Sequence, residues 1–391
     1  MQLLWDVTNT CNQRCRHCYN SQFINQRQRP DWPWTEALHQ RLKSFMALND
    51  VHLVTLAGGE PFTRRDIFRI IDALACDATV SITTNATLIT KAVAGEIAQA
   101  PLAKVAVSLE SAMPDIYNAN RGEGFFERFR AGLARLSEAR SAGASRFWLE
   151  LSVTIVPWCL REEPDIAAVF QLARQTGCDG VCYQFPNSAG VGWEHLADSQ
   201  YLVRIARIIA QLSQQYLDII TTLQYKKCLV DYCNQSLGAD LLGGKTLCPA
   251  GSEIVYMDNQ LLLFPCIYHN GSQQTKRRIA KVLGWQQHND ANHLLHIGRV
   301  DRCPLFLRFD ALKRKIAATA YPACRGCLSA SQCYKICPYD YILNRRVATR
   351  NIAGVCRLIR SDALANHESA AEMVQALEQD DRLAHRDSAC P

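Results

Sequence analysis

The stretch that decides the fold runs from Leu3 to Cys18 and reads LLWDVTNTCNQRCRHC. It opens with a short apolar run, Leu3 to Val7, of the kind typical of a buried parallel strand. Cys11, Cys15 and the final Cys18 follow with the spacing C-x3-C-x2-C. The stretch therefore predicts a buried strand whose carboxyl end leads directly into a loop with three thiols.

Further apolar runs of strand length alternate with helical stretches through the first half of the chain. We expect strands at 52–56, 79–83, 105–109, 147–155 and 181–185, and helices at 34–48, 64–75, 91–98, 125–142 and 164–176. This alternation predicts an α/β barrel or a doubly wound parallel sheet. Both folds bind ligands at the carboxyl ends of their strands, so the three thiols should lie at that end.

The short loop can bring its three thiolates onto one iron–sulfur cluster. A cubane cluster has four irons, so three cysteines leave one iron open for an outside ligand. The alternative is a zinc site, which needs a fourth protein ligand. His17 is available, but it sits between two of the cysteines, where its ring would have to turn back sharply. The spacing favours the open cluster.

A second set of cysteines lies toward the carboxyl terminus. Cys324, Cys327, Cys333 and Cys337 have the spacing C-x2-C-x5-C-x3-C, with Cys248 and Cys266 upstream and Cys356 downstream. Seven clustered cysteines suit two metal centres, and a pair of zinc ribbons is the alternative to iron–sulfur clusters. The remaining cysteines are Cys76, Cys159, Cys178, Cys182, Cys228, Cys233, Cys303 and Cys390. We expect most of them to be small buried hydrophobic residues and assign them no role, although Cys303 is suspected of one.

Polar residues follow several of the expected strands at the same end of the sheet. They are Gly58-Gly59-Glu60-Pro61, Thr84-Asn85-Ala86-Thr87, Ser108 with Glu110, and Ser152 with Thr154. Each residue alone is explained equally well by a turn, a helix cap or a satisfied hydroxyl. Their shared location predicts a site that holds a small polar molecule against the open iron.

The three N-terminal cysteines together with the Gly-Gly-Glu-Pro motif resemble the radical S-adenosylmethionine superfamily. The resemblance implies a [4Fe–4S] cluster that binds S-adenosylmethionine. The expected contacts are Gly58, Gly59 and Glu60 for the methionine amino group, Ser108 and Glu110 for the ribose, His17 for the adenine, Arg121 for the methionine carboxylate, and Asn85 and Thr154 beside them.

The C-terminal cysteines resemble the SPASM extension of the same superfamily, which carries two auxiliary [4Fe–4S] clusters. By analogy, the outer cluster would be bound by Cys324, Cys327, Cys333 and Cys356, and the inner one by Cys248, Cys266 and Cys337. The inner cluster would then have an open iron or a ligand from elsewhere. In two places the chain lacks a usual glycine: Leu261, where we assign the turn to Asp258-Asn259, and Ala86 after Asn85.

The fold expected from the resemblance is a partial (β/α)6 TIM-type barrel with a cysteine-rich SPASM domain. We place the barrel at 1–195, a helical bridge at 196–245, the SPASM domain at 246–360, and a C-terminal helix and tail at 361–391. Leu3 already begins the barrel, so no N-terminal domain for gripping a leader peptide is expected. Leader binding would then need a separate protein or the surface of the barrel.

The implied activity is cleavage of S-adenosylmethionine to a 5′-deoxyadenosyl radical that abstracts hydrogen from a ribosomally made precursor peptide. The expected product is an intramolecular C–C, C–O or thioether crosslink, with a flavodoxin- or ferredoxin-type electron donor. The alternatives are a sulfatase-type formylglycine maturase, a radical dehydrogenase of a sugar or aminocyclitol, and an iron–sulfur electron carrier without chemistry. The catalytic acid or base is not identified from the sequence.

Composition excludes several other classes. The 43 Lys and Arg against 37 Asp and Glu give a charge of +6 with no basic stripe, which argues against a nucleic-acid partner. No apolar run is long enough to span a membrane, and the N-terminus lacks the features of a secretory signal. With 18 cysteines and oxygen-sensitive clusters, a reducing cytoplasm is the expected compartment.

Overall fold

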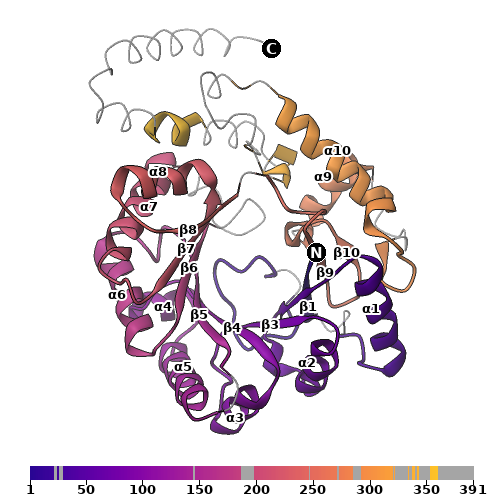
Figure 1. Ribbon diagram of the computed structural model, residues 1–391, viewed down its shortest axis with the longest axis horizontal. Helices are drawn as coiled ribbons and strands as arrows, with labels where there is room; N and C mark the ends of the chain where they lie inside the picture. Colours follow the sequence, from indigo (N-terminus) through magenta and orange to yellow (C-terminus); the bar gives the residue numbers. More distant parts are fainter. Residues whose placement is uncertain are drawn as a thin grey trace.

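The computed structural model describes residues 1–21, 24–25, 30–143, 146–185, 198–245, 247–270, 273–284, 292–319, 321, 333, 337–339, 341–342 and 353–359. Their strands form one sheet of ten strands in the order β10-β9-β1-β2-β3-β4-β5-β6-β7-β8. Figure 1 shows this sheet curving around a central opening, with helices on its outer side. The described part of the chain is therefore an open α/β barrel.

Strands β1 to β8 are mutually parallel. Strand β9 also pairs with β1 in parallel, and β10 returns antiparallel beside β9. Their bounds are β1 Gln2–Thr8, β2 Leu53–Gly58, β3 Thr79–Thr84, β4 Leu102–Leu109, β5 Trp148–Thr154, β6 Gly180–Gln184, β7 Ile220–Lys226, β8 Leu242–Lys245, β9 Ile254–Met257 and β10 Leu263–Phe264.

Helices connect the parallel strands, as right-handed crossovers require. Their bounds are α1 Glu36–Leu48, α2 Ile67–Ala75, α3 Lys91–Gln99, α4 Pro114–Arg121, α5 Phe125–Ala142, α6 Glu163–Gln175, α7 Ser199–Ser213, α8 Lys227–Leu237, α9 Gln273–Leu283 and α10 Pro304–Ala318. Side chains fix where several of them begin: Thr35 accepts a hydrogen bond from the Leu38 amide and so caps α1.

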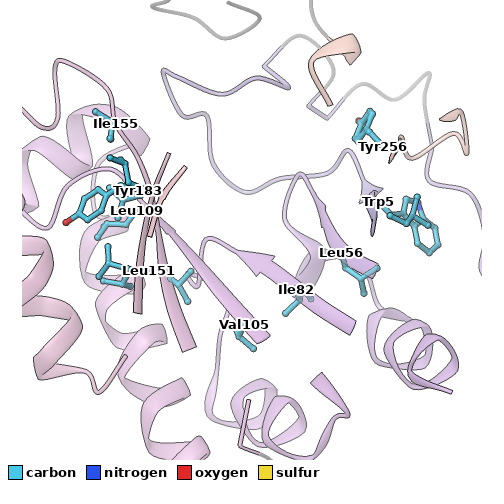
Figure 2. Close-up of a cluster of buried hydrophobic side chains, with 14 of the residues drawn as sticks. Trp5, Leu56, Ile82, Val105, Leu109, Leu151, Ile155, Tyr183 and Tyr256 are labelled. Atoms are coloured by element: carbon cyan, nitrogen blue, oxygen red, sulfur yellow. The ribbon is translucent and has the colours of Figure 1, made fainter. Parts of the chain in front are cut away.

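The main core lies between the sheet and its outer helices. Figure 2 shows Trp5, Leu56, Ile82, Val105 and Leu151 projecting from neighbouring strands toward the helices, and all are at most 1% exposed. Because side chains alternate along a strand, the intervening residues face the inside of the barrel. The inner face of the sheet is thus left to more polar residues, which is where a ligand site is expected.

The expected fold class is borne out by these elements. All six predicted strands and all five predicted helices are present, with ends displaced by three residues or fewer. Residues 196–245, expected as a helical bridge, contain α7 and α8 but also β7 and β8, so this segment extends the barrel. Residues 361–391 lie outside the described part, and the domain boundaries stay a prediction.

The cysteine-rich half of the chain is joined to the first strand. Strand β9 pairs with β1, and Val300 N donates to Asn49 Oδ1 at the end of α1 over 2.8 Å. In Figure 1, α9 and α10 lie beside β9, β10 and α1. None of the helices in the described residues has both the length and the apolar character needed to cross a bilayer.

The turn between β9 and β10 corrects one expectation. We assigned its left-handed backbone to Asp258-Asn259, but Leu261 itself has φ +61°, and its side chain is fully buried. Asp258 Oδ1 accepts hydrogen bonds from the amides of Gln260 and Leu262, and the Leu261 amide donates to Asp258 O. The carboxylate and the buried leucine hold a conformation that a leucine would otherwise avoid.

Candidate active site

The loop that carries the three cysteines leaves β1 at the mouth of the barrel. Figure 1 shows it, in indigo, crossing the central opening. Burial raises the pKa of Cys15 to about 11 and that of Cys18 to about 12, and Cys11 and Cys15 both raise the pKa of Cys18 further. The three thiols therefore lie within electrostatic range of one another and lose their protons only when a metal replaces them.

Gly58 and Gly59 allow the end of β2 to pack closely against the backbone that leads into this loop. A Cβ on Gly58, which has φ +126°, would lie 2.3 Å from Thr8 O, and one on Gly59 would lie 2.1 Å from Thr10 O. The amides of Gly59 and Glu60 donate to Thr8 O and Thr10 O over 2.8 Å each. The two glycines are needed here for backbone contact, and they hold the residues that lead into Cys11.

Glu60 is a fully buried carboxyl that joins the ends of β2 and β3. It accepts hydrogen bonds from the Thr84 hydroxyl and the Asn85 amide, both at 2.7 Å, and from the Phe62 amide at 3.3 Å. Burial raises its pKa to about 7, although these hydrogen bonds act in the opposite direction. Such a carboxyl ionises readily when a cation comes close to it.

Asn85 ties the end of β3 to the cysteine loop. Its Nδ2 donates to Asn12 Oδ1 over 2.9 Å, and Asn12 Nδ2 donates to Thr87 Oγ1 over 2.8 Å. The following Ala86 has φ +60° and is fully buried. This conformation explains why a glycine is usual at that position in the superfamily that the sequence resembles.

A buried ion pair lies on the other side of the loop. Arg121, the last residue of α4, donates through Nε and one terminal nitrogen to the two oxygens of Glu110, both at 2.6 Å. His17 Nε2 lies 3.0 Å from Glu110 Oε1, and Asn120 Nδ2 donates to Oε2. Burial opposes ionisation of Glu110, but Arg121 and His17 hold its pKa well below the ordinary value.

Two residues that the sequence did not single out connect this pair to the loop. Gln13, between Cys11 and Cys15, accepts from the remaining terminal nitrogen of Arg121 over 3.0 Å. Asn120 accepts from Trp158 Nε1 over 3.0 Å, and its backbone oxygen accepts from the Arg16 amide. Neither a glutamine nor an asparagine carries a spacing signal, so only the folded chain reveals these roles.

Ser108 and Thr154 lie on the inner face of the sheet. Ser108 is in register with Ser152, which in turn is in register with Cys182 and Thr222 on the next two strands. These side chains are partly exposed, and Gln184 Nε2 donates to Ser152 Oγ over 3.2 Å. The row forms a polar wall of the barrel interior, defined here by Ser108, Ser152, Thr154, Cys182, Gln184 and Thr222.

Asp6 is a further buried carboxyl that the sequence did not single out. It accepts hydrogen bonds from Tyr19, Asn20 and Tyr256, the last at 2.7 Å. Burial raises its pKa to about 6, against the effect of these donors. Asp6 therefore links the end of the cysteine loop to β9.

The described cysteines of the second set lie partly buried. Burial raises the pKa of Tyr339, and Cys266, Cys337 and Cys248 each raise it further, so these three thiols lie within electrostatic range of one tyrosine. Cys324 and Cys327 lie outside the described residues, as does Cys390, while Cys333 and Cys356 are partly buried.

The remaining cysteines largely follow expectation. Cys159, Cys178, Cys233 and Cys303 are buried, Cys182 and Cys228 are partly buried, and Cys76 is exposed on the surface. In the described residues, no three His, Cys, Asp or Glu side chains converge on a single metal-ion position.

The described structure is thus an α/β barrel with three thiols in the loop that follows its first strand. Residues 5–158 match the model of the Radical SAM superfamily.

The chain is 31% identical over 138 residues to mycofactocin maturase MftC of Mycolicibacterium smegmatis. That alignment covers 35% of this chain and 34% of the maturase. The chain thus spans about a third of the length of the curated mycofactocin maturase that it matches.

Solved structures extend the likeness beyond residue 158. Streptococcus suis SuiB bound to precursor peptide SuiA matches with a TM-score of 0.62 at 15% identity, over 89% of this chain and 74% of SuiB. Native anSMEcpe with bound AdoMet matches with a TM-score of 0.62 at 12% identity, over 93% of this chain and 99% of that chain. These likenesses confirm the fold class, an α/β barrel with a C-terminal extension, over most of the chain.

The superfamily implies a [4Fe–4S] cluster and S-adenosylmethionine as cofactors, and the residues fit both. Thiolates are the usual ligands of iron–sulfur clusters, and three of them end β1. Around the loop stand a carboxyl at Glu60 and a guanidinium at Arg121, opposite charges that match the amino and carboxylate groups of a methionine. The donor set and the charges therefore suit the implied group.

Proposed function

We propose that this chain is a radical SAM enzyme of the SPASM group that modifies a ribosomally made precursor peptide by an intramolecular C–C, C–O or thioether crosslink. One observation carries the proposal: the three thiols at the mouth of the barrel are flanked by Glu60 and by the Arg121–Glu110 pair. When bound, the cofactors supply a 5′-deoxyadenosyl radical that removes a hydrogen atom from the substrate.

The protein residues position the cofactors and exclude water. Cys11, Cys15 and Cys18 are the cluster ligands in this proposal. Glu60 faces the methionine amino group as an acceptor, and Arg121, held rigidly by Glu110, offers a fixed positive charge to the carboxylate. Because both groups are buried, an ionised Glu60 attracts the ammonium, and Arg121 attracts the carboxylate, more strongly than in water.

The polar wall supports a peptide as the substrate. Its hydroxyl, amide and thiol groups are uncharged and both donate and accept hydrogen bonds, which suits the amide groups of a peptide chain. Two relatives support the same class: one is named a maturase, and SuiB was solved with a precursor peptide bound. In this proposal the peptide lies along β4 to β7, inside the barrel.

We also propose that the second cysteine set binds two auxiliary [4Fe–4S] clusters that accept the electron left on the substrate. That Cys248, Cys266 and Cys337 all lie within electrostatic range of Tyr339 supports the inner of the two. Lys313 Nζ donates to the backbone oxygens of Cys248 and Ala250, which fixes the first of these ligands. The external electron donor in this proposal is a flavodoxin or ferredoxin.

The first experiment tests the radical chemistry. Anaerobically reconstituted full-length protein is expected to contain iron and sulfide and to form 5′-deoxyadenosine under strong reductant. Cys15→Ala should abolish this product, whereas Cys76→Ala, which removes an exposed cysteine outside both ligand sets, should leave it unchanged. Zinc in place of iron, or normal formation of 5′-deoxyadenosine by Cys15→Ala, would contradict the proposal.

The second experiment tests the substrate. Candidate precursor peptides are co-expressed with the enzyme and examined by mass spectrometry. A crosslink removes two hydrogen atoms from the peptide, and fragmentation across the crosslinked residues is suppressed. Cleavage of S-adenosylmethionine with every peptide left unmodified would contradict a peptide substrate and favour a small-molecule dehydrogenase.

A further inference from the structure

Gln13 is buried between two of the proposed cluster ligands. Its side chain is 3% exposed, although glutamines are mostly found at protein surfaces. Its backbone N–H donates to Cys11 Sγ over 3.4 Å, and the Cys15 thiol donates to its Oε1 over 3.7 Å. Gln13 therefore contacts two of the three sulfur atoms, once through its backbone and once through its side chain.

The amide nitrogen of this side chain lacks a hydrogen-bond acceptor. Oε1 also accepts from Arg121, but Nε2 is buried and has no partner among the residues that the structure describes. The Tyr117 hydroxyl lies close by. Burial raises its pKa to about 12 and the Gln13 amide lowers it in part, but the two groups do not align for a hydrogen bond. Leaving a buried donor without an acceptor is unfavourable, so the Nε2 group calls for an acceptor that is missing here.

Cluster binding supplies such an acceptor. A cysteine bound to iron is a thiolate, which accepts hydrogen bonds and has none to donate, so the contact from Cys15 to Oε1 is lost. Rotation of the amide exchanges its oxygen and nitrogen, which occupy nearly equivalent positions. Arg121 keeps both hydrogen bonds to Glu110 after that rotation, and its remaining nitrogen becomes available to a carboxylate.

Building on the function proposed above, we propose that Gln13 is a positioning residue whose side-chain N–H groups donate to sulfur at the Cys11–Cys15–Cys18 centre and raise its reduction potential. Each added electron makes the cluster more negative, and hydrogen bonds to its sulfur atoms stabilise the more negative, reduced form. Gln13 thereby makes the cluster easier to reduce.

The test compares midpoint potentials of the full-length, reconstituted protein. The cluster is titrated with dithionite and followed by the EPR signal that changes when S-adenosylmethionine is added, which separates it from auxiliary clusters. Gln13→Leu keeps the volume and the backbone donor but removes the side-chain donors, so its midpoint should shift to a more negative potential. The control is Gln40→Leu, the same substitution at an exposed residue of α1 whose side chain donates to Glu36, and its midpoint should stay at the wild-type value.

Equal midpoints in wild type and Gln13→Leu would overturn the proposal. If Gln13→Leu does not retain iron, Gln13→Glu serves instead, because it keeps the length and replaces the donors with acceptors. Gln13→Glu should also shift the midpoint potential to a more negative value, and an unchanged midpoint in this variant would equally overturn the proposal. Failure of the wild-type protein to bind a cluster at these cysteines would contradict the proposed function, whereas a normal wild-type cluster with an unshifted variant contradicts this inference alone.

Discussion

At two residues with the same left-handed backbone, the strain of that conformation is opposed by the packing of a buried side chain. Ala86 and Leu261 have φ +60° and +61°, where a side chain costs roughly 1–2 kcal/mol relative to glycine. Both side chains are fully buried, but one is a methyl group and the other a complete leucine. Replacing either residue by glycine would relieve a similar backbone strain, but the buried apolar surface lost would be much larger for Leu261 than for Ala86.

Substitution by glycine should therefore have opposite effects at these two sites. Ala86→Gly relieves strain and loses little packing, so the melting temperature should rise or stay level. Leu261→Gly forfeits a buried leucine, whose removal costs about 2–5 kcal/mol, and should lower it clearly. Thermal unfolding followed by circular dichroism measures both. A destabilised Ala86→Gly would mean that its methyl group packs better than its burial suggests.

Glu60 predicts a pH dependence of stability. Its pKa is about 7 in the folded protein against an ordinary 4.5, so the folded state keeps a proton that the unfolded chain releases. The free energy of unfolding should then fall as pH rises from about 4.5 to 7, by roughly 3 kcal/mol for this group. Glu60→Gln cannot titrate and should lack that contribution. Urea unfolding of wild type and variant at pH 5 and pH 8 measures it, and parallel pH profiles would refute it.

At the scale of elements, the site depends on how closely the end of β2 meets the segment that follows β1. The contact is made by backbone, and a Cβ on Gly59 would lie 2.1 Å from Thr10 O. Relief requires a shift of the segment that leads into Cys11. The geometry of the three-thiol loop is thus set in part by a strand that carries none of the thiols.

Gly59→Ala should therefore reduce iron incorporation, because it displaces the loop. The matched control is Gly95→Ala in α3, where the added methyl group would meet no described atom within 4 Å beyond its chain neighbours and the backbone of its own helix. In a helix interior this change should stabilise by about 1 kcal/mol. Iron content per protein after reconstitution distinguishes the two variants. Full iron loading of Gly59→Ala would show that the loop tolerates the shift.

The sequence predicted the elements whose buried faces are continuous and apolar. The sequence did not predict β7, because Thr222 and Gln224 face the barrel interior and interrupt the apolar run. The helical periodicity of the residues just before β7 led us to expect a helical segment instead. The sequence also did not predict α4, which spans only Pro114–Arg121. In the site, motif spacing named the cysteines and Glu60, but Gln13 and Arg121 are brought together only by the fold. A contact between two residues far apart in the chain, such as this one, produces no periodic pattern in the sequence.

At the scale of the whole molecule, the two halves of the chain share one sheet and one buried carboxyl. Strand β9 lies beside β1, and Tyr256 donates to Asp6 over 2.7 Å across 250 positions of sequence. The same carboxyl accepts from Tyr19, next to Cys18. The C-terminal half therefore helps to fix the end of the N-terminal thiol loop.

Tyr256→Phe should lower stability by about 1–3 kcal/mol, because it removes one donor from a buried carboxyl. Tyr183→Phe is the matched control: its buried hydroxyl has no hydrogen-bond partner among the described residues, so its removal should be neutral or slightly stabilising. Thermal unfolding of both variants tests this. Equal losses would mean that tyrosine hydroxyls matter here for packing and not for their hydrogen bonds.

The pairing of β9 with β1 also bears on how the protein can be divided. A fragment that ends near residue 195 would keep the residues that match the superfamily but lose the neighbour of its first strand. The freed backbone groups of β1 would then be an open edge, ready to pair with a second fragment. Trimmed versions should consequently aggregate, and a minimal catalytic piece would have to carry its own substitute for β9.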